Sequence, residues 1–134
     1  MVIKKMQSEN ATGIKVCVPT IGQNGLVEMV SPHFGRAPTF TVVDTDTNAV
    51  KVLQNTSEHM GGVGLPPELM ARAGVQVMLC SGLGPRAIQM FEEYGIEVYV
   101  GADGTVTDAI QAWRRGLLQV ATDKNACEMH RHHP

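Results

Sequence analysis

The chain has 134 residues, 43% of them hydrophobic and 18% charged, and its net charge is −2 at pH 7. This length predicts a single domain with one hydrophobic core. The near-neutral charge provides no basic surface for nucleic acid, and no apolar stretch is long enough to span a membrane. Three widely spaced cysteines do not suit a disulfide framework, so we expect reduced thiols and a cytoplasmic location.

Composition divides the chain into three parts. Residues 1–13 are polar and predict a flexible leader, whereas residues 14–120 contain the apolar runs that a folded domain needs. Residues 121–134 form a polar, Cys/His-rich end, which we expect to be a flexible tail.

The first half of the domain predicts strands separated by two long loops. Residues 14–18 form an apolar run that ends at Pro19, and a loop rich in glycine and proline follows. Alternating apolar residues over 39–44 and 49–54, joined by turn residues, predict an antiparallel hairpin. A second glycine-rich loop spans residues 55–64.

The second half of the domain alternates helices with buried strands. Thr105-x-x-Asp108 is typical of a helix capping box, and each predicted helix ends at a glycine. The predicted helices cover 66–73, 85–94 and 105–115, and the apolar strands cover 75–80 and 96–100. We therefore expect an α/β fold of three layers, with about three helices and a mixed, mostly parallel five-stranded sheet that includes one antiparallel strand.

The predicted topology selects three loops for binding. Ligands of such sheets bind beyond the carboxyl ends of the parallel strands, at a topological switch point. The loops there contain Ser31-Pro32-His33-Phe34-Gly35-Arg36, His59 and Ser81–Pro85. The proline, the glycine and an anchoring phenylalanine would hold His33 and Arg36 in a defined place. A tight turn with a solvent-exposed histidine is the alternative.

The residue types in these loops suit a transition metal or an anion. His33 and His59 can each offer an imidazole nitrogen to a metal, although His59 can instead cap the helix behind it. Glycines before two helices expose backbone N–H groups that attract anions, and they are Gly61, Gly62, Gly64, Gly82 and Gly84. A sulfide-rich cluster and a phosphate both fit such donors. For the last two glycines, a tight turn is an equal explanation.

Other polar residues carry weaker signals. Arg36 and Arg86 can pair with an anion or be ordinary surface arginines. Cys17 and Cys80 are expected to be small buried hydrophobes, with Cys80 nearer to the crevice. No phosphate-loop lysine follows the glycines, and the first strand has no carboxylate, so we expect neither nucleotide hydrolysis nor nuclease activity.

The tail contains enough donors for a separate metal site. One thiol and three imidazoles lie within seven residues, at Cys127, His130, His132 and His133. They suit zinc or nickel, but the spacing is not that of a zinc finger. We expect weak, exchangeable metal binding, with a solvated tail as the alternative.

Four motifs occur in order: residues 31–37, 58–64, 82–87 and 104–109. Over about residues 14–118 the chain resembles the dinitrogenase iron–molybdenum cofactor biosynthesis family, which includes NifX/NafY-like proteins and the C-terminal domain of NifB-like proteins. The resemblance implies a ribonuclease-H-like fold without nuclease activity. It also implies a non-enzymatic protein that binds or carries an iron–sulfur or iron–molybdenum-type cluster, with a cluster donor or recipient protein as partner. An anion- or nucleotide-binding regulatory module is the alternative.

Overall fold

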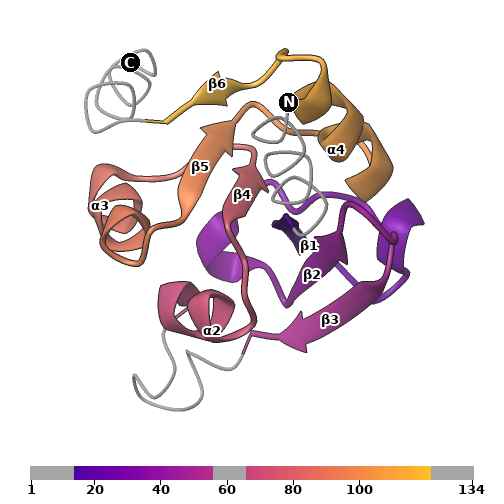
Figure 1. Ribbon diagram of the computed structural model, residues 1–134, viewed down its shortest axis with the longest axis horizontal. Helices are drawn as coiled ribbons and strands as arrows, with labels where there is room; N and C mark the ends of the chain where they lie inside the picture. The colour runs from indigo at the N-terminus through magenta and orange to yellow at the C-terminus, as the bar shows by residue number, and fades with distance from the viewer. Residues whose placement is uncertain (1–13, 56–65, 122–134) are drawn as a thin grey trace, which may run out of the picture.

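The computed structural model describes residues 14–55 and 66–121. These residues form a sheet with the strand order β3-β2-β1-β4-β5-β6 (Figure 1). The strands are β1 (Lys15–Thr20), β2 (Thr39–Asp44), β3 (Val50–Gln54), β4 (Val77–Cys80), β5 (Glu97–Val100) and β6 (Gln119–Val120). The helices are α2 (Pro66–Arg72), α3 (Pro85–Glu93) and α4 (Val106–Arg114), with short 3₁₀ helices η1 (Gly25–Val27) and η2 (Phe34–Arg36).

The sheet is mixed, as predicted. Strands β1, β4 and β5 are neighbours and run parallel. β2 is antiparallel to β1, β3 to β2, and β6 to β5. The predicted α/β class and three helices are confirmed, but the described sheet has six strands instead of five, and two of them, β2 and β6, run against the rest. The sequence did not reveal β6 because two residues are too few to show strand alternation.

The first strand continues beyond Pro19, where the sequence predicted its end. Pro19 lies opposite Phe40 of β2. On the side of β1 that faces away from β2, the carbonyl oxygen of Pro19 accepts a hydrogen bond from Ser31 N at 2.8 Å. β4 pairs with β1 only at Val16 and Cys17. The nitrogen of Pro19, which has no hydrogen to donate, therefore faces a side of the strand that β4 does not reach.

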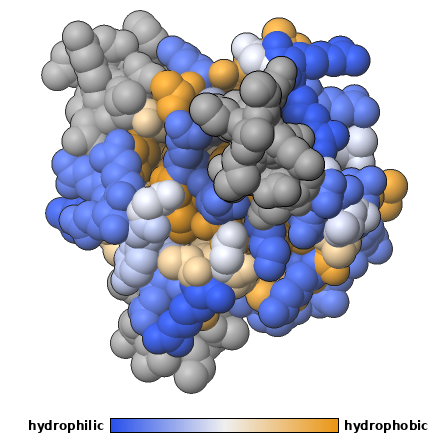
Figure 2. All heavy atoms as spheres, viewed as in Figure 1, coloured by the Kyte–Doolittle hydropathy of each residue, from blue (hydrophilic) through white to orange (hydrophobic). Residues whose placement is uncertain are grey.

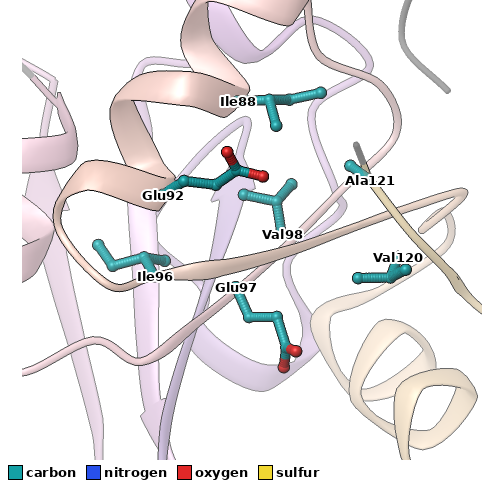
Figure 3. A pocket seen from close by; sticks show the side chains of 7 residues that line it. All are labelled: Ile88, Glu92, Ile96, Glu97, Val98, Val120 and Ala121. Atoms are coloured by element: carbon teal, nitrogen blue, oxygen red, sulfur yellow. The ribbon is translucent and has the colours of Figure 1, made fainter. Parts of the chain in front are cut away.

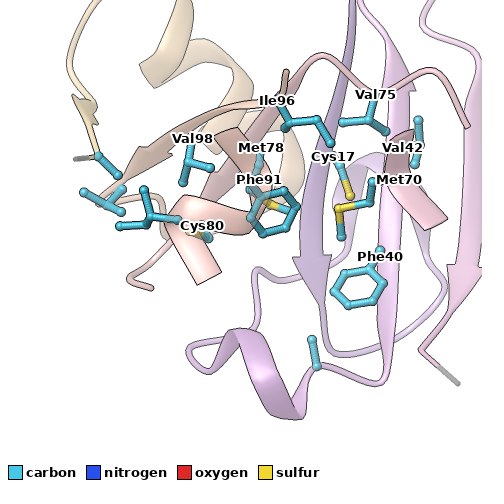
Figure 4. Packing of buried hydrophobic residues seen from close by; sticks show 14 residues of the cluster. Cys17, Phe40, Val42, Met70, Val75, Met78, Cys80, Phe91, Ile96 and Val98 are labelled. Atoms are coloured by element: carbon cyan, nitrogen blue, oxygen red, sulfur yellow. The ribbon is translucent and has the colours of Figure 1, made fainter. Parts of the chain in front are cut away.

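Helices cover both faces of the sheet. Met70 of α2 and Phe91 of α3 pack with one set of strand side chains, which we call the α2/α3 cluster (Figure 4). Val106 and Ile110 of α4 pack with the other set, the α4 cluster. Successive residues of β1 alternate between the two clusters, as the pleat of a buried strand requires. The result is the predicted three-layer arrangement.

The predicted helix ends are confirmed. Thr105 Oγ1 accepts a hydrogen bond from Asp108 N at 3.1 Å, and Asp108 Oδ2 accepts one from Thr105 N at 3.0 Å, which completes the capping box of α4. Gly74, Gly95 and Gly116 follow the three helices with positive φ angles of 84°, 75° and 73°. Each of these glycines therefore ends its helix in the left-handed region that other residues rarely adopt.

Figure 2 shows one face of the molecule, where hydrophilic side chains cover most of the described surface and apolar ones reach it in between. Among the helices that the structure describes, none combines the length and the apolar character that crossing a membrane requires.

Candidate functional site

The carboxyl ends of β1, β4 and β5 lie at one edge of the sheet because these strands are parallel. The chain leaves β1 toward β2 on one side and leaves β4 toward β5 on the other, so the topological switch point lies between β1 and β4. β3 also ends at this edge, since Gln54 pairs with Thr39 at the start of β2. All three loops selected from the sequence therefore begin at this edge.

Hydrogen bonds hold the loop after β1 across this edge. Val30 forms an antiparallel bridge with Thr20 at the end of β1, and Val30 N donates to the carbonyl oxygen of Gly104, after β5, at 2.8 Å. Met29 forms a second bridge with Thr105. Because β4 lies between β1 and β5, residues 29–31 lie over the carboxyl end of β4.

Three buried threonines support the same loop. Thr20 Oγ1 lies 2.7 Å from Thr39 Oγ1 and 2.9 Å from Thr41 Oγ1, and all three residues are at most 2% exposed. Thr39 Oγ1 lies 2.6 Å from the carbonyl oxygen of Gly22, to which it can donate. Buried hydroxyls need such partners, so this network joins the start of the loop to β2.

A buried carboxylate fixes the shape of the loop. Glu28 is 5% exposed, and its carboxylate accepts hydrogen bonds from Asn24 N at 3.0 Å and Met29 N at 2.9 Å. A Cβ atom on Gly22 would lie 2.5 Å from Glu28 Oε1, so any larger residue there would displace this carboxylate from its position. Glu28 was not among the residues selected from the sequence, although it is the only carboxylate between residues 21 and 35.

Gly22→Ala is expected to lower the free energy of unfolding by about 1–3 kcal/mol, because the new methyl group displaces a buried carboxylate from its N–H donors. Urea denaturation measures this change. Gly35→Ala is the matched control in the same loop: a Cβ there meets no atom within 4 Å and φ is not positive. It should be neutral or stabilise by up to about 1 kcal/mol. Equal stability of the two variants would contradict the role assigned to Gly22.

His33 is exposed, but its backbone is held firmly. Ser31 Oγ accepts a hydrogen bond from His33 N at 3.3 Å and donates one to the carbonyl oxygen of His33 at 3.1 Å. The next residue, Phe34, packs against Phe40 and Phe91, with ring centroids 5.6 Å apart in both pairs. The predicted phenylalanine anchor is therefore present. The prediction that the loop needs a glycine at position 35 is wrong. The φ angle of Gly35 is not positive, and there is space for a side chain at this position.

The turn after β4 lies against the same core as the His33 loop. Leu83 and Phe34 both pack on the α2/α3 cluster. Gly84 is the N-cap of α3, where no side chain caps the helix and no acidic residue lies in the first turn. Gly82 has no positive φ, and a Cβ there would meet no atom within 4 Å, so neither backbone conformation nor packing requires this glycine. Because Gly84 has no side chain that could cap α3, the first free N–H groups of this helix suit an anion.

Arg36 and Arg86 are both exposed, at the end of η2 and in the first turn of α3. They can bring positive charge to the two loops that carry His33 and the start of α3. With the imidazole of His33 and the backbone N–H groups, these arginines are the candidate donors for an anion that has a single side-chain metal ligand. Such a set does not enclose a metal ion as a structural zinc site does.

Several residues selected from the sequence lie outside the described residues. They are His59, Gly61, Gly62 and Gly64, between β3 and α2 in the sequence, and Cys127, His130, His132 and His133 near the C-terminus. Within residues 14–55 and 66–121, no three His, Cys, Asp or Glu side chains are grouped as metal ligands would be. His33 is the only histidine in those ranges.

Both described cysteines are buried, as predicted. Cys17 and Cys80 belong to the α2/α3 cluster and are at most 1% exposed (Figure 4). Burial raises the pKa of the Cys80 thiol to about 12. It also raises the pKa of Cys17, and the neighbouring Cys80 adds to that rise. The thiols therefore stay protonated near neutral pH and are poor metal ligands.

The acidic residues considered for nuclease chemistry are separated. Asp44 pairs with Lys15 at the opposite edge of the sheet and accepts hydrogen bonds from its own turn. Asp108 caps α4 at the edge where His33 lies. These carboxylates therefore do not converge on a shared metal position.

A hollow of about 200 Å³ lies between α3 and the edge formed by β5 and β6 (Figure 3). Its lining includes the carboxylates of Glu92 and Glu97 beside apolar side chains. None of the residues selected from the sequence lines it. Its negative charge makes it unsuited to an anion, so we do not assign the site to this hollow.

The dinitrogenase iron–molybdenum cofactor family matches residues 15–116 of the chain. An uncharacterized protein of Methanocaldococcus jannaschii is 32% identical over 111 residues, which cover 79% of this chain and 90% of that protein. The apo form of the orange protein from Desulfovibrio gigas is 31% identical with a TM-score of 0.72, covering 81% of this chain and 93% of that one. A Thermotoga protein that is described as a NifB protein, solved by NMR, is 29% identical with a TM-score of 0.65. The match covers 80% of this chain and 92% of that one. A match over most of the chain, with the same three-layer sheet, shows that this protein belongs to the dinitrogenase iron–molybdenum cofactor family.

Proposed function

We propose that this protein binds and carries an iron–sulfur or iron–sulfur–heterometal cluster as an accessory to metallocofactor assembly, without being an enzyme. Membership of the iron–molybdenum cofactor family supports a role in handling such clusters. The observation that carries the proposal is the position of His33: its backbone is fixed on both sides while its side chain stays exposed at the sheet edge.

The described residues support a specific division of labour. His33 would bind a metal of the cluster through an imidazole nitrogen. The N–H groups at the start of α3, with Arg36 and Arg86, would balance the negative charge of a sulfide-rich cargo. We include His59 and Gly61, Gly62 and Gly64 in the proposed site, because they follow β3 in the sequence and β3 ends at the same edge. One exposed ligand on an open edge suits a cargo that is passed to, or taken from, another protein.

Anaerobic reconstitution with iron and sulfide tests the proposal. We expect charge-transfer absorbance and bound iron and sulfide in a stable ratio to the chain. The alternative is an anion- or nucleotide-binding regulatory module, which the uncapped start of α3 favours. Equilibrium dialysis with ATP and with inorganic phosphate separates the two. Nucleotide binding by a protein that takes up no cluster would overturn our proposal.

We also propose that the C-terminal residues Cys127, His130, His132 and His133 bind zinc or nickel weakly. Residues 122–134 contain few apolar side chains for a core. A chain ending at Ala121 should therefore keep its free energy of unfolding within about 0.5 kcal/mol while it loses zinc and nickel affinity. In the full chain, the affinity should fall as pH decreases and imidazoles are protonated. Calorimetric titration measures the affinity, and unchanged metal binding after truncation would contradict the assignment.

A further inference from the structure

The outer edge of β3 has backbone groups that no described residue uses. Asp44 N donates a hydrogen bond to the carbonyl oxygen of Ala49 at 2.9 Å, so Asp44 and Ala49 are a hydrogen-bonded pair of the β2–β3 ladder. In an antiparallel ladder, hydrogen-bonded pairs alternate with pairs that are not hydrogen-bonded. Val50, Val52 and Gln54 belong to the second kind, so their N–H and C=O groups point away from β2. In the described sheet, β3 is the terminal strand (Figure 1).

A groove of about 250 Å³ lies beside this edge, between β3 and α2. Leu53, Leu69 and Ala73 provide apolar contacts, while Lys51 and Arg72 provide positive charge. Arg72 pairs with Glu68 of the same helix at 2.6 Å. Lys51 is exposed, and no carboxylate of the described residues pairs with it. The groove therefore has an apolar wall and a net positive charge.

The usual protections of an edge strand are largely missing from β3. Its pairing with β2 continues through five residues without a bulge, and it contains no proline. Val50 is 39% exposed. Lys51 is its only charged residue, and it lies at the groove. Strands with such open edges accept a further strand readily.

We propose that β3 binds an extended segment of a partner protein by strand addition, with one apolar side chain in the groove and one acidic side chain beside Lys51. In this mode the main-chain bonds give affinity and the groove gives specificity. A second copy of this chain suits the edge less well. Antiparallel pairing of two β3 edges about a two-fold axis would bring Lys51 of both copies to one face, where like charges repel.

A random peptide library displayed on phage, panned against the full chain, tests this inference. We expect enriched sequences of strand-forming residues in which an acidic residue lies two positions from an apolar one. Synthetic peptides of the enriched sequences, measured by fluorescence anisotropy, should bind at least tenfold more weakly to Val52→Pro. The outward N–H of Val52 is not used within the sheet, so proline removes a donor for the partner without removing a β2 bond.

Two further variants complete the test. Val52→Ala keeps the N–H group and should change peptide affinity less than twofold. Lys51→Glu should weaken the binding of the acidic peptides at least tenfold. This variant provides the test if circular dichroism shows that Val52→Pro does not fold. Enrichment without the acidic–apolar pattern, or affinity unchanged in Lys51→Glu, would overturn the inference. So would self-association of the wild-type chain in sedimentation that Val52→Pro abolishes, because β3 would then bind a second copy.

Discussion

His33→Ala is expected to remove most of the cluster loading while leaving the fold intact. His33 is the only imidazole in the described part of the site edge, and its side chain makes no hydrogen bond there. Loss of an outer-sphere partner typically costs about 10–100-fold in metal affinity, and loss of a ligand should cost at least as much. The backbone bonds to Ser31 and the packing of Phe34 do not depend on the imidazole.

Iron and sulfide bound per chain after anaerobic reconstitution measure the effect, with the melting temperature and circular dichroism expected to match the wild type. Gln23→Ala is the control, since it removes another exposed polar side chain from the same loop. His59→Ala should reduce loading more mildly. Full loading of His33→Ala would place the ligands elsewhere, for example among residues 122–134, and would remove the main support for our site.

The sequence predicted the elements that carry a strong local pattern. The hairpin of β2 and β3 has alternating apolar residues on both strands, and α4 has a capping box and an apolar stripe. β6 has neither, because its two residues form a strand only through pairing with Tyr99 and Val100 of β5. Such a strand depends on contacts between distant parts of the chain, which local patterns do not contain.

The position of the His33 loop was predictable from topology, but the contacts that support the loop were not. The rule for parallel strand ends located the His33 loop at the sheet edge without any knowledge of side-chain contacts. The bonds that hold the loop join partners far apart in sequence, as Val30 and Gly104 do. The fit of Glu28 against Gly22 depends on a loop conformation that no spacing rule describes. His59 and the tail residues lie outside the described structure and stay predictions.

The buried thiols predict a marked loss of stability in alkali. In the unfolded chain, cysteine has a pKa near its ordinary value of 9.0, whereas burial in the fold raises the pKa of Cys80 to about 12 and raises that of Cys17 as well. Between these values the folded state binds more protons than the unfolded state. Their stabilising contribution is complete below pH 9 and is lost as pH rises toward 12.

Between the unfolded and the folded pKa, each buried thiol should lower the free energy of unfolding by about 1.36 kcal/mol per pH unit, so both together should lower it by about 2.7 kcal/mol per unit. Urea denaturation between pH 8 and pH 9.5, which lies below the ordinary tyrosine pKa of about 10, measures this slope. Cys127→Ser serves as the parent, which leaves only the two buried thiols. Adding Cys17→Ala and Cys80→Ala should lower stability at every pH, because each leaves a small cavity, but the slope should become nearly flat. An equally steep slope in parent and variant would show that groups other than these thiols control the alkaline transition.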